Sequence, residues 1–442
     1  GGPAKVAVIA SALMGTMNGT SAGNAVATGS LTIPLMKKVG YSPTFAAATE
    51  AVASSGGQVM PPIMGAGIFI MAEITGIPYL RLMAAGIIPA ILYFSSAFLV
   101  VDYEAVKLGL RGFPRSALPK FGPIMKKSFL FLPVLILFGL MLSGRSVIMA
   151  GFFGIISSVV VSWVNALYER DIKKGVDIPK IIKALNDGAR GTVQLMAVCG
   201  AAGIVMGVIG LTGIGVKFAN LLLGIAGTSQ LLALIFTMGV AILLGMGMPT
   251  TAAYAIGASV LAPGLIRIGL QPLVAHMFIF YFACMSAITP PVALASYAAS
   301  GISGSDPMKT GYMSFRLGLA AYIVPFMFYY SPSLILGNMK ELFQLGEFLA
   351  DGTVAVEAIP LAIVIIRTVT ALIGIYALAS AIQRWYFGKI TLIPQLSLFA
   401  AALFLMTPQS YGDIVGLLVM ATLFFYSKKI KKTETLEPSA TS

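Results

Sequence analysis

The segment GTSAGNAVATGSLTIPLMKKVGYSP occupies residues 19–43, and the segment MPTTAAYAIGASVLAPGLIRIGLQP occupies residues 248–272. At a constant offset of 229 residues, Pro34 falls on Pro263, Gly40 on Gly269 and Pro43 on Pro272. The match continues without a gap, and Pro61, Pro62 and Pro78 fall on Pro290, Pro291 and Pro307. Proline is about one residue in twenty of an average chain. This coincidence therefore predicts one structural unit present twice, at residues 19–91 and 248–320.

Each copy interrupts a strongly apolar stretch in the same two places. A turn rich in small and polar residues comes first, and a Pro-Pro pair follows it. Duplicated, interrupted helices are typical of secondary transporters, whose repeats place the breaks around a binding site at the membrane midplane. The pattern therefore indicates a transporter.

The composition indicates an all-α polytopic membrane protein. Hydrophobic residues make up 58% of the 442 residues and charged residues 10%, whereas a soluble domain carries about 25% charged residues. Mean hydropathy is +0.92. The formal net charge of +13 comes from basic residues that lie mostly between apolar stretches, where positive charge reports orientation. We therefore expect a lipid bilayer as the environment and no nucleic-acid partner.

Residues for enzymatic or metal chemistry are scarce. Cys199 and Cys284 lie in apolar stretches and His276 is the one histidine, so disulfides and His/Cys metal sites lack ligands. The apolar stretches also hold too few acidic residues for a nucleophile with its base. We expect no catalytic residues and no enzyme activity.

Basic clusters give the orientation of the expected spans. They lie at 107–127, 170–183 and 428–432, and the positive-inside rule makes all three cytoplasmic. Counting spans from these clusters makes the hairpin at 4–38 open from the cytoplasm and the hairpin at about 228–266 open from outside. The two copies would then form an inverted repeat.

The hairpins are too short to cross the membrane twice. A turn near Asn18–Ser21 leaves arms of about 15 residues, or roughly 22 Å of helix against a hydrocarbon core of about 30 Å. Helices that end at this depth must pack in protein or line a watery cavity, because lipid satisfies no peptide group. The spans 43–75 and 272–301 each carry hydroxyls before a Pro-Pro pair, which frees carbonyl oxygens for a dehydrated Na⁺. We expect two re-entrant helical hairpins, two broken transmembrane helices and a buried site between them.

These elements divide the chain into five expected parts. They are residues 1–78, the first hairpin and broken helix of a transport domain; 79–227, scaffold helices and cytoplasmic loops; 228–305, the second hairpin and broken helix; 306–335, a scaffold helix; and 336–442, further transmembrane helices and a cytoplasmic tail.

The residues at the breaks also resemble a known family. The runs Gly19–Asn24 and Gly29–Pro34, with Pro61-Pro62, resemble the large membrane (M) subunit of tripartite ATP-independent periplasmic (TRAP) transporters. In the second copy, Gly245–Thr251 and Ser286–Pro291 resemble the branch whose soluble partner is of the TAXI type. The resemblance covers about residues 1–335.

This resemblance implies an elevator-type alternating-access mechanism, in which the transport domain slides against a scaffold and a Na⁺ gradient drives uptake. It implies an extracytoplasmic TAXI-type substrate-binding protein that delivers a small organic anion, a carboxylate, to the inner membrane of a prokaryote. It also implies a small four-helix membrane component, separate or fused upstream. Because the chain opens Gly1-Gly2-Pro3 and no apolar span precedes the first copy, we expect an incomplete N-terminus.

The resemblance also assigns site residues. One Na⁺ site would comprise Thr20, Ser21, Asn24, Ser54, Ser55 and Gly57, and the other Thr250, Thr251, Ser286 and Thr289. Substrate would lie near Asn18, Gln58, Pro61, Pro249 and Pro290. Pro249 stands where Thr20 stands in the first copy, so the two ion sites need not have equal geometry.

Other interpretations of the same features stay open. A stand-alone Na⁺/carboxylate symporter would use these breaks without a binding protein, and an ion channel would also place broken helices at mid-depth. Glu50 lies about two turns into its span. Its carboxylate is either a functional group within the membrane or half of an ion pair on a helix face.

Overall fold

The computed structural model describes residues 2–110, 121–171, 175–227, 229–336, 361–406 and 410–436. In these ranges the chain is helical and forms no strand, apart from an isolated bridge between Trp385 and Lys389. Five helices are long and apolar enough to cross a membrane, at Tyr79–Lys107, Val147–Glu169, Ile178–Thr212, Pro307–Tyr330 and Leu361–Gln383. The helical structure and its five apolar helices therefore confirm the prediction of an all-α polytopic membrane protein.

The chain forms two compact units, Gly1–Gly112 with Val205–Ser442, and Phe113–Ile204. The first contains α1 (Gly2–Gly15), α2 (Ser21–Lys38), α3 (Pro43–Gly57), α4 (Gly67–Thr75), α5 (Tyr79–Lys107), α10 (Ile214–Ala226), α11 (Gln230–Gly245), α12 (Thr250–Arg267), α13 (Pro272–Met285), η4 (Ser286–Ile288), α14 (Leu294–Ser303), α15 (Pro307–Tyr322), α16 (Val324–Tyr330), η5 (Pro332–Ile335), α17 (Leu361–Gln383), α18 (Leu392–Met406) and α19 (Ser410–Leu436). The second contains α6 (Phe121–Lys126), η2 (Ser128–Phe131), α7 (Leu132–Leu142) and α8 (Val147–Glu169). Helix α9 (Ile178–Thr212) begins in the second unit and ends in the first.

The two copies fold into matching elements. Helices α2 and α12 both begin and end at positions 229 residues apart, and so do the first residues of α3 and α13. Gly40 and Gly269, just after α2 and α12, have φ of +106° and +99°, a conformation that glycine adopts at low cost. Pro43 and Pro272 then occupy the first turn of the next helix, where a missing N–H costs nothing. The identical glycine and proline residues at these turns therefore end and begin the helices at matching positions in the two copies.

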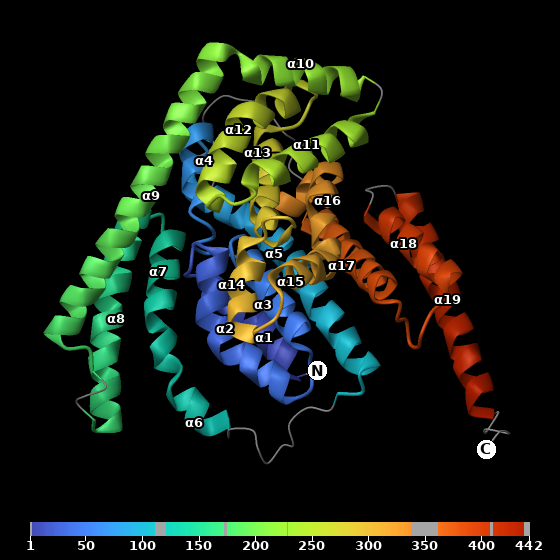
Figure 1. Cartoon of the computed structure of the whole chain (residues 1–442), viewed down its shortest axis with the longest axis horizontal. Coiled ribbons are helices and arrows are strands. Elements are labelled where there is room, and N and C mark those ends of the chain that lie inside the picture. Colours follow the sequence, from blue (N-terminus) through green and yellow to red (C-terminus); the bar gives the residue numbers. More distant parts are fainter. Residues whose placement is uncertain are drawn as a thin grey trace. The chain divides into compact units, whose positions relative to one another are not determined.

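The second half of each interrupted helix packs against the other copy. Helix α4 contacts α12 and α13, whereas α14 contacts α2 and α3 (Figure 1). The peptide bonds Pro61-Pro62 and Pro290-Pro291, which precede these two helices, are both cis. The two copies therefore form one interlocked body, and neither is an independent module.

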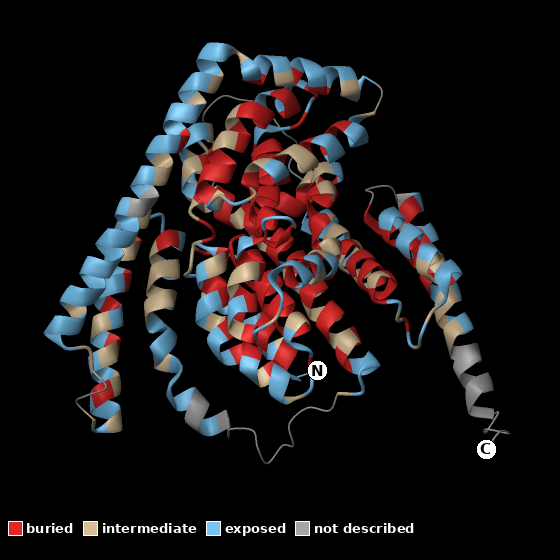
Figure 2. Ribbon diagram, viewed as in Figure 1, coloured by how far each residue is buried: buried red, intermediate tan, exposed pale blue. Residues whose placement is uncertain are grey.

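The core of this unit lies along α3 and α13. Every residue from Phe45 to Gly57 and every residue from Leu273 to Met285 is buried. Figure 2 shows this buried centre, with exposure rising toward the outer helices of the same unit. A helix buried on all sides is surrounded by protein, so its polar side chains must find partners there.

The structure differs from the expected spans at three places. Helix α9 begins at Ile178, inside the basic cluster at 170–183 that the sequence assigns to the cytoplasm. Helix α10 was not expected, and it follows directly on α9 because Gly213 turns the chain at φ 66°. The scaffold helix expected at 306–335 is divided at Ile323, where Pro325 prevents continuation of the i−4 hydrogen bonds of α15.

Some expectations fall outside the described residues. They concern Arg111, Arg115, Lys120, Lys173, Lys174, the side chains of 428–432, and parts of the expected C-terminal region at 337–360, 407–409 and 437–442.

The close approach of α1 and α3 gives a first prediction. A Cβ at Gly15 would lie 2.3 Å from the Cα of Gly57, which is backbone and cannot yield cheaply. We expect Gly15→Ala to lower the stability of the purified protein by about 1–3 kcal/mol, measured as a lower Tm in detergent. Gly239→Ala in α11 is the matched control, because no heavy atom lies within 4 Å of a Cβ there. Equal Tm values for the two variants would contradict the α1–α3 contact.

Candidate functional site

Each hairpin is interrupted by a short non-helical tip. The first tip separates α1 from α2 at residues 16–20, and the second separates α11 from α12 at residues 246–249. The first break coincides with the turn expected near Asn18–Ser21. Thr20 and Pro249 are the N-cap residues of α2 and α12, with ψ of 134° and 140°. Their φ values differ, at −128° for Thr20 and −58° for Pro249, and Pro249 supplies no hydroxyl.

The first tip is organised by local polar contacts. The backbone N–H of Thr20 donates to Asn18 Oδ1 at 3.4 Å. Gly23 leaves room for both side chains, because a Cβ there would lie 2.5 Å from Thr20 Oγ1 and 3.5 Å from the Asn18 amide. Asn18 is partly buried and Thr20 is exposed, so the tip presents polar atoms at its surface.

Gln58 joins the two tips. Its Nε2 donates to the carbonyl of Gly19 at 3.1 Å and to Thr250 Oγ1 at 2.9 Å, and Thr250 Oγ1 lies 3.1 Å from Gln58 Oε1. The side chain is 1% exposed. The structure therefore brings together two expected site residues, Gln58 and Thr250, that are 192 positions apart in the chain.

The two broken helices meet directly at Ser55. Its hydroxyl donates to the carbonyl of Cys284 at 2.7 Å. The separation of these residues is 229, which equals the offset of the repeat, so Ser55 contacts the residue that matches it in the other copy. Matching residues of two copies contact each other in this way where the two-fold axis that relates the copies passes between them.

Asn24 carries an oxygen without a partner. Its Nδ2 donates to the carbonyl of Ser11 at 3.0 Å, and its Oδ1 is buried and accepts no hydrogen bond in the described part of the chain. A Cβ at Gly57 would lie 3.0 Å from this Nδ2, so Gly57 also borders the amide. A buried acceptor left unsatisfied is costly, and a bound cation would satisfy it.

The other residues of the first expected ion site have separate partners or positions. Ser54 donates to Glu50 Oε1 at 3.1 Å, and Ser55 is engaged by Cys284. Ser21 is buried at the start of α2, and Thr20 lies on the exposed tip. The structure thus places Asn24 and Gly57 side by side and directs the two serines elsewhere.

At the second expected ion site, Thr289 contacts a residue that the sequence did not indicate, Tyr322. Thr289 Oγ1 donates to the carbonyl of Met285 at 2.8 Å and also contacts the hydroxyl of Tyr322 on α15. Ser286 donates to the carbonyl of Ala283 and lies where a Cβ on Gly245 would fall. Thr251 is buried, whereas Thr250 reaches Gln58.

The expected substrate prolines lie at the margins of this arrangement. Pro61 and Pro290 are partly buried, Pro249 is exposed, and Pro290 lies near Gly311 of α15. The carbonyl of the second proline in each Pro-Pro pair accepts a hydrogen bond from a tyrosine hydroxyl, since Tyr79 donates to Pro62 and Tyr297 to Pro291.

Glu50 is surrounded by hydroxyl groups. The side chains of Ser11, Thr28 and Thr32 contact its carboxylate closely, and Ser54 adds a fourth contact. The residue is 0% exposed, and no basic side chain of the described residues pairs with it. Within the described residues, the Glu50 carboxylate therefore has hydroxyl partners in place of an ion pair.

Sequence reasoning missed Ser11, Thr28, Thr32 and Tyr322. A signal existed for two of them, since Asn24, Thr28 and Thr32 recur every four residues and so share one face of α2. No comparable signal existed for Ser11 or Tyr322, because each comes from a different helix and reaches the site only through packing.

The comparisons with known proteins agree on one family. A family model described as "Tripartite ATP-independent periplasmic transporter, DctM component" matches residues 1–343. The chain is similar to the isethionate TRAP transporter permease protein DctMQ of Oleidesulfovibrio alaskensis, with 25% identity over 69% of this chain and 47% of that protein. It is also similar to the C4-dicarboxylate TRAP transporter large permease protein DctM of Pseudomonas aeruginosa, with 26% identity over 69% of each chain.

The uncharacterized protein y4mL of Sinorhizobium fredii is 27% identical over 46% of this chain and 48% of its own length. The matched region therefore spans about half the length of two of these three relatives.

The bridge made by Gln58 gives a second prediction. We expect Gln58→Ala to increase amide hydrogen exchange at both tips, at residues 16–20 and 246–249, because each tip loses the side chain that connects it to the other. The measurement is hydrogen–deuterium exchange of the reconstituted protein by mass spectrometry. Gln271→Ala is the control, since the Gln271 side chain makes no cap hydrogen bond at the start of α13. Faster exchange at one tip alone would contradict the bridge.

Proposed function

The chain belongs to the DctM component family of tripartite ATP-independent periplasmic transporters, and from this premise we propose that it catalyses Na⁺-coupled uptake of a small organic anion across the inner membrane. The anion would be delivered by an extracytoplasmic substrate-binding protein, and a small membrane component would complete the transporter. The observation that carries the proposal is the meeting of the two breaks, through Ser55 with Cys284 and Gln58 with Thr250.

An inverted repeat is the arrangement that this meeting supports best. Contact between matching residues, and the exchange of α4 and α14 between the copies, are what two copies related by a two-fold axis would produce, and the basic clusters of the sequence favour the antiparallel orientation. We propose that residues 1–78 and 228–305 form the transport domain and that 79–227 and 306–335 act as scaffold, with elevator-type movement between them. The helices of 336–442 would extend the membrane region.

The substrate would bind at the tips. Helices α2 and α12 begin there, at Ser21 and Thr250, and the N-terminus of a helix carries partial positive charge and free N–H groups. Gln58 bonds Gly19, two residues before α2, and Thr250, the first residue of α12, so one side chain borders both helix starts. These features favour an anion, and the names of two relatives refer to a C4-dicarboxylate and to isethionate. We propose a carboxylate, bound near Asn18, Gln58 and the tip backbone.

The first Na⁺ site would centre on Asn24. Its Oδ1 is a buried acceptor without a donor in the described residues, and hard cations such as Na⁺ are bound by oxygen atoms. Ser11 connects this amide to Glu50, because its carbonyl accepts from Asn24 and its hydroxyl contacts the carboxylate. Glu50 would therefore supply the negative charge that stabilises a cation in a medium of low dielectric constant.

The second copy lacks this charge. The positions that match Ser11, Asn24, Thr28, Thr32, Glu50 and Ser54 are Val240, Ala253, Gly257, Leu261, Ile279 and Ala283. A polar cluster needed only for packing would be as useful in one copy as in the other. Its restriction to the first copy favours a role in ion coupling, while a second, uncharged ion site would use Thr289 with the hydroxyls around it.

A binding protein of the TAXI type is the partner that we propose from the motifs Gly245–Thr251 and Ser286–Pro291. The rival function is a stand-alone Na⁺/carboxylate symporter, which would use the same tips and breaks. The two differ in one measurable property, the need for the binding protein.

Uptake by proteoliposomes tests the function. The vesicles would contain this protein with its small membrane component, and the medium would contain the purified binding protein and radiolabelled succinate. We expect accumulation only when binding protein and an inward Na⁺ gradient are both present, with K⁺ in place of Na⁺ as the control. Uptake without the binding protein would favour the stand-alone symporter, and uptake indifferent to Na⁺ would refute the coupling ion.

The first ion site gives a separate prediction. We expect Asn24→Ala and Glu50→Gln each to raise the Na⁺ concentration for half-maximal uptake at least about tenfold, since one removes an oxygen ligand and the other the neutralising charge. Asn165→Ala is the matched control, because Asn165 Oδ1 on α8 is also buried and unpartnered in the described residues. Unchanged Na⁺ dependence in both variants would remove Asn24 and Glu50 from the ion site.

A further inference from the structure

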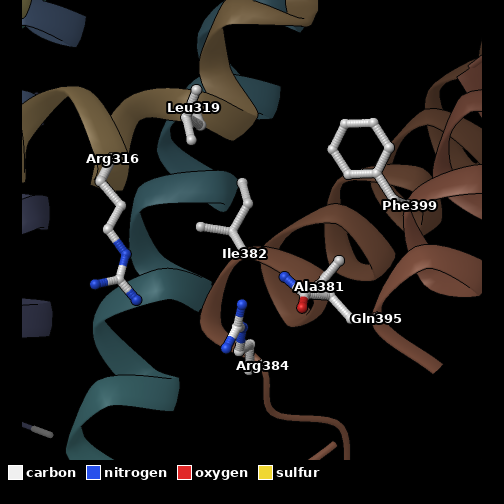
Figure 3. Close-up of a pocket in the computed structure, with 7 residues that line it drawn as sticks. All are labelled: Arg316, Leu319, Ala381, Ile382, Arg384, Gln395 and Phe399. Atoms are coloured by element: carbon white, nitrogen blue, oxygen red, sulfur yellow. The ribbon is translucent and has the colours of Figure 1, made fainter. Parts of the chain in front are cut away.

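A separate pocket lies among α15, α17 and α18. Its volume is about 510 Å³, and its lining comprises Arg316, Leu319, Ala381, Ile382, Arg384, Gln395 and Phe399 (Figure 3). None of the residues expected at the ion or substrate sites lines it. The transport mechanism proposed above therefore leaves this pocket without a role.

The polar lining of the pocket is cationic, and no ion pair or side-chain donor for it occurs among the described residues. The guanidinium groups of Arg316 and Arg384 form no ion pair with any acidic side chain of the described chain, whereas Arg367 on the same helix bundle pairs with Asp413 at 2.8 Å. Gln395 Oε1 is a buried acceptor that has no donor among the described residues. Both arginines are exposed, and their positive charges would attract an anion into the pocket that they line.

Residues beside the pocket locate it at the membrane surface. The run Trp385-Tyr386-Phe387 follows Arg384 directly, and aromatic residues of this kind concentrate where hydrocarbon meets water. The hydroxyl of Ser427 donates to the carbonyl of Tyr386 at 2.8 Å. The chain continues from Ser427 into Lys428 and Lys429, which the positive-inside rule assigns to the cytoplasm. The pocket thus lies at the level of the cytoplasmic headgroups.

We propose that this pocket binds the headgroup of an anionic phospholipid of the cytoplasmic leaflet, of the phosphatidylglycerol type. Arg316 and Arg384 would hold the phosphate, because planar guanidinium groups match phosphate oxygens in geometry and charge. Gln395 Oε1 would accept a hydrogen bond from a headgroup hydroxyl. Leu319, Ile382 and Phe399 provide the apolar wall that the glycerol and acyl portions require. Basic pockets between membrane helices on this side are suited to such lipids.

Lipid-dependent stability tests the proposal without any need for transport. The full-length protein would be reconstituted in phosphatidylcholine vesicles with increasing fractions of phosphatidylglycerol, and its Tm recorded at each fraction. We expect phosphatidylglycerol to raise the Tm of the unmodified protein in a saturable manner. In Arg316→Gln/Arg384→Gln, the fraction needed for half of the effect should increase at least tenfold. A Tm independent of phosphatidylglycerol in the unmodified protein would overturn the proposal, even if the double variant failed to fold.

Two controls separate this site from general surface charge and from a soluble anion. Arg267→Gln removes a basic residue at the end of α12 and should leave the lipid response unchanged, so an equal loss in that variant would overturn the assignment. Inorganic phosphate should add little stability in pure phosphatidylcholine, since it brings no apolar portion to the pocket. A phosphate effect as large as that of the lipid would assign the pocket to a soluble anion and overturn the lipid as occupant.

Discussion

Peptide groups that lose their helical partners inside a membrane must find partners in protein, and this requirement shapes the first unit of the molecule. Side chains from distant segments supply the donors. Gln58 serves the carbonyl of Gly19, Ser55 that of Cys284, and Tyr79 that of Pro62. Each of these bonds closes a break in one helix with a side chain from another element. The breaks therefore converge because isolated breaks would be costly, and the convergence in turn creates a polar region inside the unit.

Packing around this polar region leaves its helices little freedom to move relative to one another. Helices α3 and α13 are buried along almost their whole lengths, and Gly15 and Gly57 allow α1 and α3 to approach closely. The exchange of α4 and α14 between the copies ties each half of the unit to the other. A rearrangement of one tip would thus be transmitted to both copies. This property suits a body that moves as a whole, which is what the proposed elevator movement requires.

The sequence predicted the elements better than their partners. A constant offset of 229 residues located both hairpins, both tips and both Pro-Pro breaks, because turns depend on local chemistry such as Gly40 and Pro43. Partners depend on which helices pack together, and no local pattern encodes that. Asn24, Thr28 and Thr32 could be placed on one face of α2, but nothing indicated that Ser11 and Glu50 would face them. Tyr322 reached Thr289 from α15 for the same reason. The site residues Ser54 and Ser55 were expected to act together, yet they point to different partners, since neighbours on a helix face different directions.

The two copies share one backbone arrangement but differ in their polar side chains, and these two properties have separate consequences. Equal backbones place two tips and two breaks around one centre, which a single copy could not do. Equal side chains are not needed for this, and the two copies have diverged where the backbone does not constrain them. The first copy buries Glu50 among hydroxyls at a position where the second has Ile279, whereas the second pairs Tyr254 with His276 at positions where the first has Ala25 and Ala47. A fixed negative charge on one side of the centre would attract a cation there and repel an anion. An anionic substrate would then be held toward the helix starts at the tips, and a filled ion site would be a condition for its binding. Coupling between ion and substrate would in this way follow from charge alone, without direct contact between the two.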